Sequence, residues 1–136
     1  MAAHSTIAQN EQYYRIILDN LSQGIIVCQL LYNEQEEPVD YLILDINHAV
    51  EEHSGLKKEQ IVGKRATEIR SVVEPEWLLK CGEVVKTGKT AELEIYNASS
   101  FDGWIDVQVI SLQHQDRFLI LFTNITEHVK LKETLR

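Results

Sequence analysis

The last third of the chain contains three consecutive segments with the residue pattern of β-strands. Residues 90–97 and 104–112 alternate apolar with polar side chains, which is typical of strands that bury one face. Residues 117–124 (RFLILFTN) form a nearly continuous apolar run, typical of a central strand with both faces covered. The polar segments between them, FDG and HQD, favour turns. Three strands joined by short connections therefore predict an antiparallel sheet.

The first part of the chain adds a helix and a β-hairpin. From Glu11 onward, apolar residues recur at helical spacing until Gly24 stops the pattern. Residues 24–32 and 39–46 are rich in branched apolar residues, and a short polar connection ending in Pro38 separates them. We therefore expect a helix followed by two paired strands.

Short helical segments occupy the middle of the chain. Residues 48–55 and 74–88 have apolar residues at helical spacing, and each ends in a glycine. Residues 56–69 read as shorter helical pieces interrupted by Gly63. The predicted order is helix, two strands, several short helices, three strands and a final helix. This order predicts an α+β fold with a five-stranded antiparallel sheet.

Length, charge and cysteine count narrow the functional class. A chain of 136 residues predicts one domain, and its formal net charge of −8 disfavours nucleic-acid partners, since binding phosphates requires clustered Lys and Arg. No segment approaches the roughly 18 apolar residues of a membrane-spanning helix, and the N-terminus lacks the features of a secretory signal. Cys28 and Cys81 do not make a disulfide framework, so we expect reduced thiols in a cytoplasmic protein without membrane contact.

Five segments carry a resemblance to a known family. They are ILDNLSQGIIV, DINHAVEEHSGLKKEQIVGKRATEI, VVKTGKTAELE, FDGWIDVQVISL and FTNITEHVKLKETL. In this order and spacing they resemble the motifs of a PAS domain, and the match covers residues 14–136. Each motif alone has low specificity, but five in the family's order are specific.

The resemblance implies the PAS fold, in which short helices cover one face of the sheet and helices flank the domain at both ends. It implies a flexible N-terminus over residues 1–12, a sensory domain with its preceding helix over residues 13–126, and the start of a signalling linker helix over residues 127–136. PAS domains are sensory and dimerisation modules. They usually lie upstream of an output domain, such as a histidine kinase or a diguanylate cyclase, in the same polypeptide.

Two cofactor classes of the family are disfavoured by the residues at the matching positions. In GKRATEI, Ala66 takes the place of the photoreactive cysteine of flavin-binding LOV domains. Trp77 takes the place of the histidine that binds haem iron, and an indole nitrogen is only a donor. The five histidines form no tight ligand cluster, so no metal is expected. The identity of any other cofactor stays open.

The remaining candidate site is an apolar pocket between the sheet and the helices. Its ligand would be small and largely apolar, because no Arg or Lys clearly points inward from the strands. The alternative is a filled core, since an alternating apolar face more often packs against its own side chains. The candidate pocket residues are Ile26, Cys28, Ile46, Val50, Leu78, Cys81, Leu93, Ile105, Val107, Ile120 and Phe122.

Nothing in the sequence indicates catalysis. Neither a phosphate-binding glycine loop nor a G-x-S-x-G nucleophile motif is present. The acidic run NEQEEPVD lies in a hairpin connection, where such residues are usually solvated. A small α+β enzyme therefore stays a distant alternative to a binding or signalling module.

The two ends of the chain carry candidate interaction and relay residues. Tyr13, Ile16, Ile17 and Leu21 form an apolar stripe that either packs on its own sheet or pairs with the same helix of a second copy, giving a homodimer. At the other end, Asn124 is the expected N-cap of the last helix, with Glu127 as its capping-box partner. With Thr126, Leu131 and Leu135, these residues are expected to relay a signal to the output domain.

Overall fold

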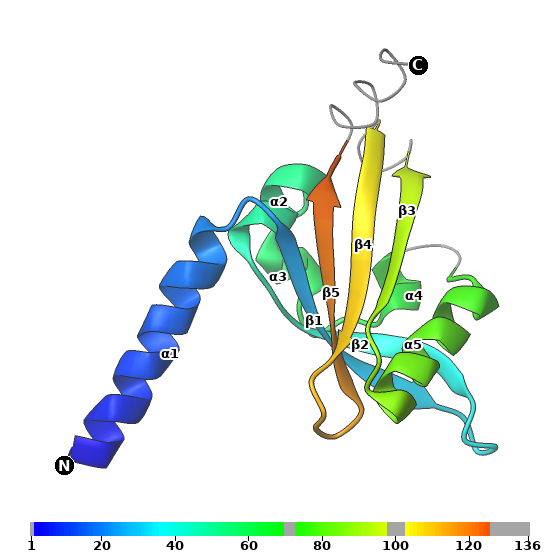
Figure 1. Ribbon diagram of the computed structural model, residues 1–136, viewed down its shortest axis with the longest axis horizontal. Helices are drawn as coiled ribbons and strands as arrows, with labels where there is room; N and C mark the ends of the chain where they lie inside the picture. Colours follow the sequence, from blue (N-terminus) through cyan, green and yellow to red (C-terminus); the bar gives the residue numbers. More distant parts are fainter. Residues whose placement is uncertain (1, 70–72, 98–102, 126–136) are drawn as a thin grey trace.

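The computed structural model describes residues 2–69, 73–97 and 103–125. From the first helix to the last strand, its elements follow the predicted order, and Figure 1 shows their arrangement. They are α1 (Ala2–Asn20), β1 (Gly24–Tyr32), β2 (Pro38–Ile46), α2 (His48–Ser54), α3 (Lys58–Ile61), α4 (Ala66–Ile69), α5 (Pro75–Thr87), β3 (Ala91–Asn97), β4 (Gly103–Ser111) and β5 (Arg117–Asn124).

The strands form one five-stranded sheet in the order β2-β1-β5-β4-β3, and every neighbouring pair is antiparallel. This confirms the predicted sheet. Because β1 and β5 are adjacent and antiparallel, the start of β1 lies beside the end of β5: Gly24 pairs with Phe122. The segment that enters the sheet and the segment that leaves it therefore meet at the same end of the sheet (Figure 1).

The short helices pack on one face of the sheet, as predicted. Val50 from α2, Ile61 from α3, Ala66 from α4 and Cys81 from α5 are all buried in one apolar cluster. The strands supply the other half of this cluster with every second residue, because successive strand side chains point to opposite faces. The domain core thus lies between α2–α5 and the inner face of the sheet.

Two of the glycines that were expected to end helices do so. Gly24, which was expected to stop the first helix, instead opens β1, and α1 already ends at Asn20. Gly55 follows α2 and Gly88 follows α5, with φ values of 75° and 76°. A side chain strains the backbone in this left-handed region, so glycine is the natural residue there. Pro75 opens α5, where its missing N–H removes no helical hydrogen bond.

The structure differs from the expectation at the N-terminus, where the helix begins at Ala2 and not near Glu11. Residues 2–10 (AAHSTIAQN) contain three alanines and no glycine or proline, and alanine has the highest intrinsic helix propensity. Figure 1 shows α1 projecting away from the sheet. The predicted linker helix over residues 127–136 lies outside the described residues, and the predicted domain boundaries stay predictions.

Candidate functional site

The candidate pocket residues come together in one apolar core. Eight of the eleven are buried: Cys28, Ile46, Val50, Leu78, Cys81, Ile105, Val107 and Ile120. The other three, Ile26, Leu93 and Phe122, are half-buried and pack against this cluster. Their proximity is compatible both with a ligand pocket and with a filled core, so their role in binding stays a prediction.

The same core contains residues that the sequence analysis did not single out. For those on strands, the phase of the strand was the available signal: Leu30 continues the alternation of β1, and Val109 continues that of β4. Phe118 has the phase of Ile120 and is fully buried. The additional buried members are Leu30, Tyr41, Ile43, Ile61, Ala66, Val84, Val109 and Phe118.

A pair of aromatic side chains brings polar atoms to this core. The indole Nε1 of Trp77 donates to the Tyr41 hydroxyl at 3.4 Å. The Tyr41 ring meets the Phe118 ring edge to face, with centroids 5.5 Å apart and planes at 71°. Trp77 thus packs at the edge of the core, at the position that the resemblance compared with a haem-binding histidine. Its hydrogen bond orients the phenol of Tyr41.

The two cysteines behave as core residues. Both are fully buried and free. Burial raises the pKa of Cys28 well above its ordinary value, and the nearby Cys81 thiol raises it further. Burial also raises the pKa of Cys81 to about 12. Both sulfurs therefore stay protonated at neutral pH, which disfavours a role as nucleophile or metal ligand.

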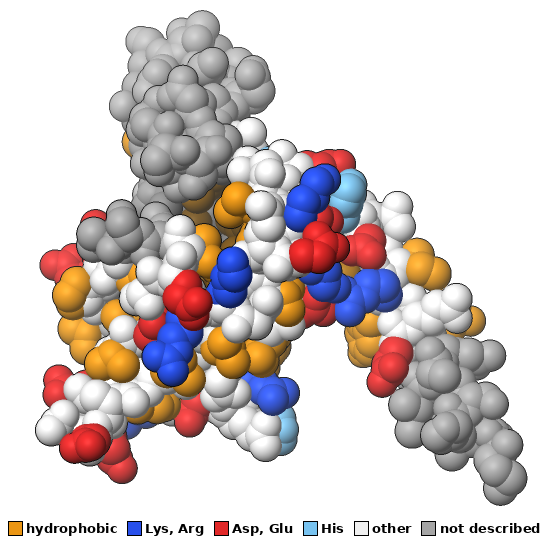
Figure 2. Space-filling view, turned by 180° about the vertical axis from the view of Figure 1, so that it is seen from behind, with side chains coloured by type: hydrophobic (Ala, Val, Ile, Leu, Met, Phe, Trp, Pro, Cys, Tyr) orange, Lys and Arg blue, Asp and Glu red, His pale blue; other side chains and the backbone are white. Residues whose placement is uncertain are grey.

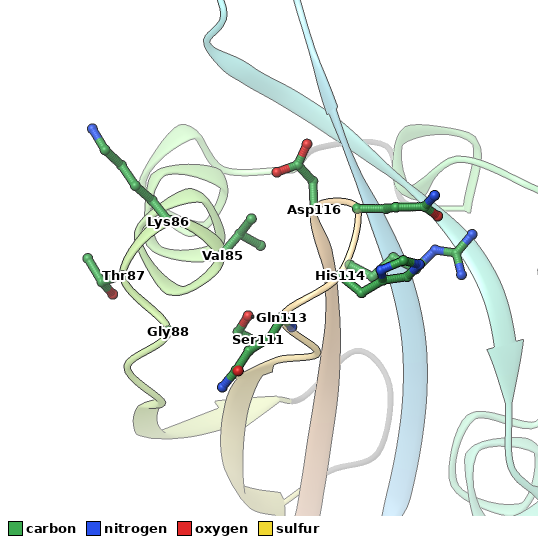
Figure 3. A pocket seen from close by; sticks show the side chains of 10 residues that line it. Val85, Lys86, Thr87, Gly88, Ser111, Gln113, His114 and Asp116 are labelled. Carbon is green, nitrogen blue, oxygen red and sulfur yellow. Dashed lines mark hydrogen bonds between the residues drawn. The ribbon is translucent and has the colours of Figure 1, made fainter.

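A surface hollow of about 520 Å³ lies between the end of α5 and the turn from β4 to β5 (Figure 3). None of the eleven candidate residues lines it. In Figure 3 the Lys86 side chain extends away from this turn. The hollow by itself indicates no particular ligand. Within the described residues, moreover, no group of three or more His, Cys, Asp or Glu is arranged to hold a metal ion.

The apolar stripe of α1 is exposed. Tyr13, Tyr14, Ile16 and Ile17 each retain between 52% and 66% of their accessible surface, and Leu21 retains 36%. In Figure 2, hydrophobic side chains are visible on the described part of this projecting helix. With this much of its surface exposed, the stripe does not pack on the sheet of its own chain. Separately, no helix among the described residues is both long and apolar enough to span a membrane.

The C-terminal half of α1 is nevertheless held to the domain by polar contacts. Arg15 Nη2 lies 2.9 Å from Asp45 Oδ2, and Lys58 Nζ lies 3.0 Å from Asp45 Oδ1. Burial acts to raise the pKa of Asp45, but the hydrogen bonds from Arg15 and Lys58 outweigh it, so the pKa lies below its ordinary value of 3.8. The Asp45 carboxylate is therefore ionised at neutral pH and bridges α1 to α3.

Asn47 makes the central contact of this attachment. It is 2% exposed and lies between β2 and α2. Its Oδ1 accepts a hydrogen bond from the Ile25 N–H at 2.9 Å. Its Nδ2 donates to the Leu18 carbonyl at 2.8 Å and to the Gln23 carbonyl at 2.9 Å. One amide thus satisfies backbone groups of α1, of the following connection and of β1.

The predicted relay residues are described only in part. Asn124 is exposed and is the last residue of β5. The helix that it was predicted to cap lies outside the described residues, so its role as N-cap stays a prediction. Thr126, Glu127, Leu131 and Leu135 lie outside the described residues. Their role in a relay stays a prediction.

Comparison with known proteins shows the fold. No family model matches the sequence, and no curated protein matches it. Among solved structures, a domain of a sensory box sensor histidine kinase/response regulator from Geobacter sulfurreducens is similar over 87% of this chain and 96% of its own, with 12% identity and a TM-score of 0.62.

Two further solved structures agree. The PAS domain of an HTR-like protein from Haloarcula marismortui is similar over 91% of this chain and 98% of its own, with 15% identity and a TM-score of 0.62. A sensory box sensor histidine kinase from Vibrio cholerae is similar over the same shares, with 14% identity and a TM-score of 0.59. At these identities the likeness establishes the architecture of the sheet and its helices.

Proposed function

We propose that this chain, which has the fold of PAS domains, is a sensory and regulatory module that dimerises and passes conformational changes to an output domain in the same polypeptide. The observation that carries the proposal is that the chain enters and leaves the sheet side by side. The connection after α1 enters the sheet at Gly24, which pairs with Phe122 near the end of β5, and the apolar core lies directly beneath both strands. A change in the core or in α1 therefore acts on the segment that leaves the domain.

The proposed function is regulatory. The described core contains apolar side chains, two protonated thiols and the Trp77–Tyr41 pair. A catalytic site in such an interior requires a carboxylate or imidazole with a shifted pKa. The two buried polar or charged residues among those described, Asp40 and Asn47, are hydrogen-bonded to backbone groups, and Asp40 also accepts from the Thr67 hydroxyl.

The core is proposed to bind a small, largely apolar ligand, and a filled core is the alternative. Native mass spectrometry of the purified chain distinguishes the two. A sensor yields a species heavier than the polypeptide by the mass of a small molecule, and unfolding releases that molecule. If no such species forms, and no compound in a metabolite screen raises the melting temperature, the alternative of a ligand-free interaction module holds.

Dimerisation is proposed to use the exposed stripe of α1. Replacing Ile17 with Glu places a charge in the apolar contact, and burying an unpaired charge costs several kcal/mol. We expect the dissociation constant of the homodimer to rise by about tenfold or more. Light scattering across a range of protein concentrations measures this change.

The matched control for the dimer is Glu11→Gln, which changes the charge of α1 by the same single unit at an exposed position. Glu11 is not three, four or seven residues from any member of the stripe, so it lies on a different face of α1. It should leave the dissociation constant within about twofold of the unmodified chain. A chain that stays monomeric at all concentrations contradicts the homodimer. Equal weakening by both variants contradicts the assignment of the interface to this stripe.

A further inference from the structure

We propose that α1 is linked to the end of β5 by a series of side-chain contacts. A movement of α1 is then transmitted to the segment that follows β5 even when the core holds no ligand. The linking residues, called the joint below, are Ser22, Gln23, Gly24, Asn47, His53, Phe122 and Thr123. The link itself is a property of the fold, and its use in signalling rests on the proposed function.

The first contact of the joint is the packing of Phe122 on Gly24. These two residues are partners across β1 and β5. A Cβ atom placed on Gly24 would clash with Cζ of Phe122, so the ring sits directly over the glycine backbone. Only a residue without a side chain allows this approach. The first residue of β1 therefore determines where the Phe122 ring can lie.

The second contact is a hydrogen bond that spans the same pair of strands. Gln23 Nε2 donates to Thr123 Oγ1 at 3.1 Å. The carbonyl of Gln23 accepts from Asn47 Nδ2, and the same amide group donates to the Leu18 carbonyl in α1. A continuous path of hydrogen bonds thus runs from the last turns of α1 through Asn47 and Gln23 to Thr123.

The third contact comes from α2. The His53 ring meets the Phe122 ring at 65°, with centroids 5.7 Å apart. His53 Nε2 lies 3.2 Å from the Ser22 carbonyl oxygen, to which an N–H at this nitrogen donates. His53 therefore contacts the connection after α1 and the end of β5 at the same time. A shift of Ser22 moves the ring that covers Phe122.

The place of these contacts in the fold makes them suited to transmission. Phe122 and Thr123 are the last residues before Asn124, where β5 ends. The next residue, Ile125, donates its N–H to the Trp104 carbonyl at 3.0 Å. The joint therefore acts on the last residues of β5 and on the hydrogen bond that follows them. In a two-state model of allostery, α1 and the segment that follows β5 would both shift the conformational equilibrium of the same element, which is the end of β5.

The test is amide hydrogen exchange, followed by NMR on the whole chain at one protein concentration. Arg15→Ala removes the ion pair that orients α1 and touches no residue of the joint. We expect it to change the exchange rates of residues 123–125 by about threefold or more. In a Gln23→Ala, His53→Ala background the same substitution should change these rates by less than about 1.5-fold.

Two controls separate the joint from general destabilisation. Glu11→Ala, at an exposed position on α1, should leave residues 123–125 unchanged. Leu93→Ala removes apolar contact from the core on β3, away from the joint, and should leave the Arg15→Ala effect intact. The inference is overturned if Arg15→Ala leaves the exchange rates of residues 123–125 unchanged. It is also overturned if Arg15→Ala changes these rates equally in the Gln23→Ala, His53→Ala background. Neither result depends on a ligand, a dimer or an output domain, so the proposed function is tested separately.

Discussion

Replacing Asn47 with alanine is expected to lower the free energy of unfolding by about 3 kcal/mol, because three backbone groups lose their partner together. The Ile25 N–H loses its acceptor, and the Leu18 and Gln23 carbonyls lose their donor. Asn47 is 2% exposed, so water does not readily replace these hydrogen bonds. Urea denaturation followed by circular dichroism measures the change.

The control for this experiment is Asn33→Ala. Its Oδ1 also accepts two backbone N–H groups, from Gln35 and Glu37, but in the exposed hairpin connection between β1 and β2. Water can satisfy those groups, so we expect a loss of about 1 kcal/mol or less. Equal losses in the two variants would show that Asn47 is an ordinary turn residue and not the attachment of α1.

The Phe118→Ala substitution is expected to cost about 3–5 kcal/mol of unfolding free energy, the range for removing a fully buried aromatic side chain. Phe118 is 0% exposed and pairs with both β1 and β4 from the central strand. The loss leaves a cavity beneath the Tyr41 ring, which meets Phe118 edge to face. Guanidinium denaturation monitored by Trp fluorescence reports the change.

A smaller substitution keeps this prediction measurable if Phe118→Ala does not fold. Phe118→Leu retains most of the apolar contact and should cost about 1–2 kcal/mol. Leu79→Ala, on α5 but 59% exposed, should cost less than about 1 kcal/mol. Similar values for Phe118→Leu and Leu79→Ala would contradict the position of Phe118 in the centre of the core.

The strands and short helices could be predicted because their signals are local. Alternation in residues 104–112 and the apolar run over 117–124 define β4 and β5 within a single window of sequence. Gly55 and Gly88 mark helix ends through their own backbone preference. The start of α1 was predicted too late because residues 2–10 are mostly small and polar, whereas their alanines and their lack of glycine and proline allow the helix to extend to Ala2.

The candidate site was predictable in its apolar part only. Strand phase and helical spacing identify which side chains point inward, and all eleven candidates lie in or against the core. The polar contacts were not predictable, since they join residues far apart in sequence: Arg15 with Asp45, and Gln23 with Thr123. No local pattern indicates which carboxylate or hydroxyl a distant donor will meet. The register of the sheet sets these pairs.

The relay of a conformational signal out of the domain can be measured most directly in fusions to the catalytic region of a sensor histidine kinase. The chain is joined to it at seven successive linker lengths, which sample one heptad of a continuous helix. We expect autophosphorylation to rise and fall with linker length, and Thr126→Pro to flatten this profile by breaking a helix at the junction. Equal activity at all seven lengths, with and without Thr126→Pro, would contradict the account.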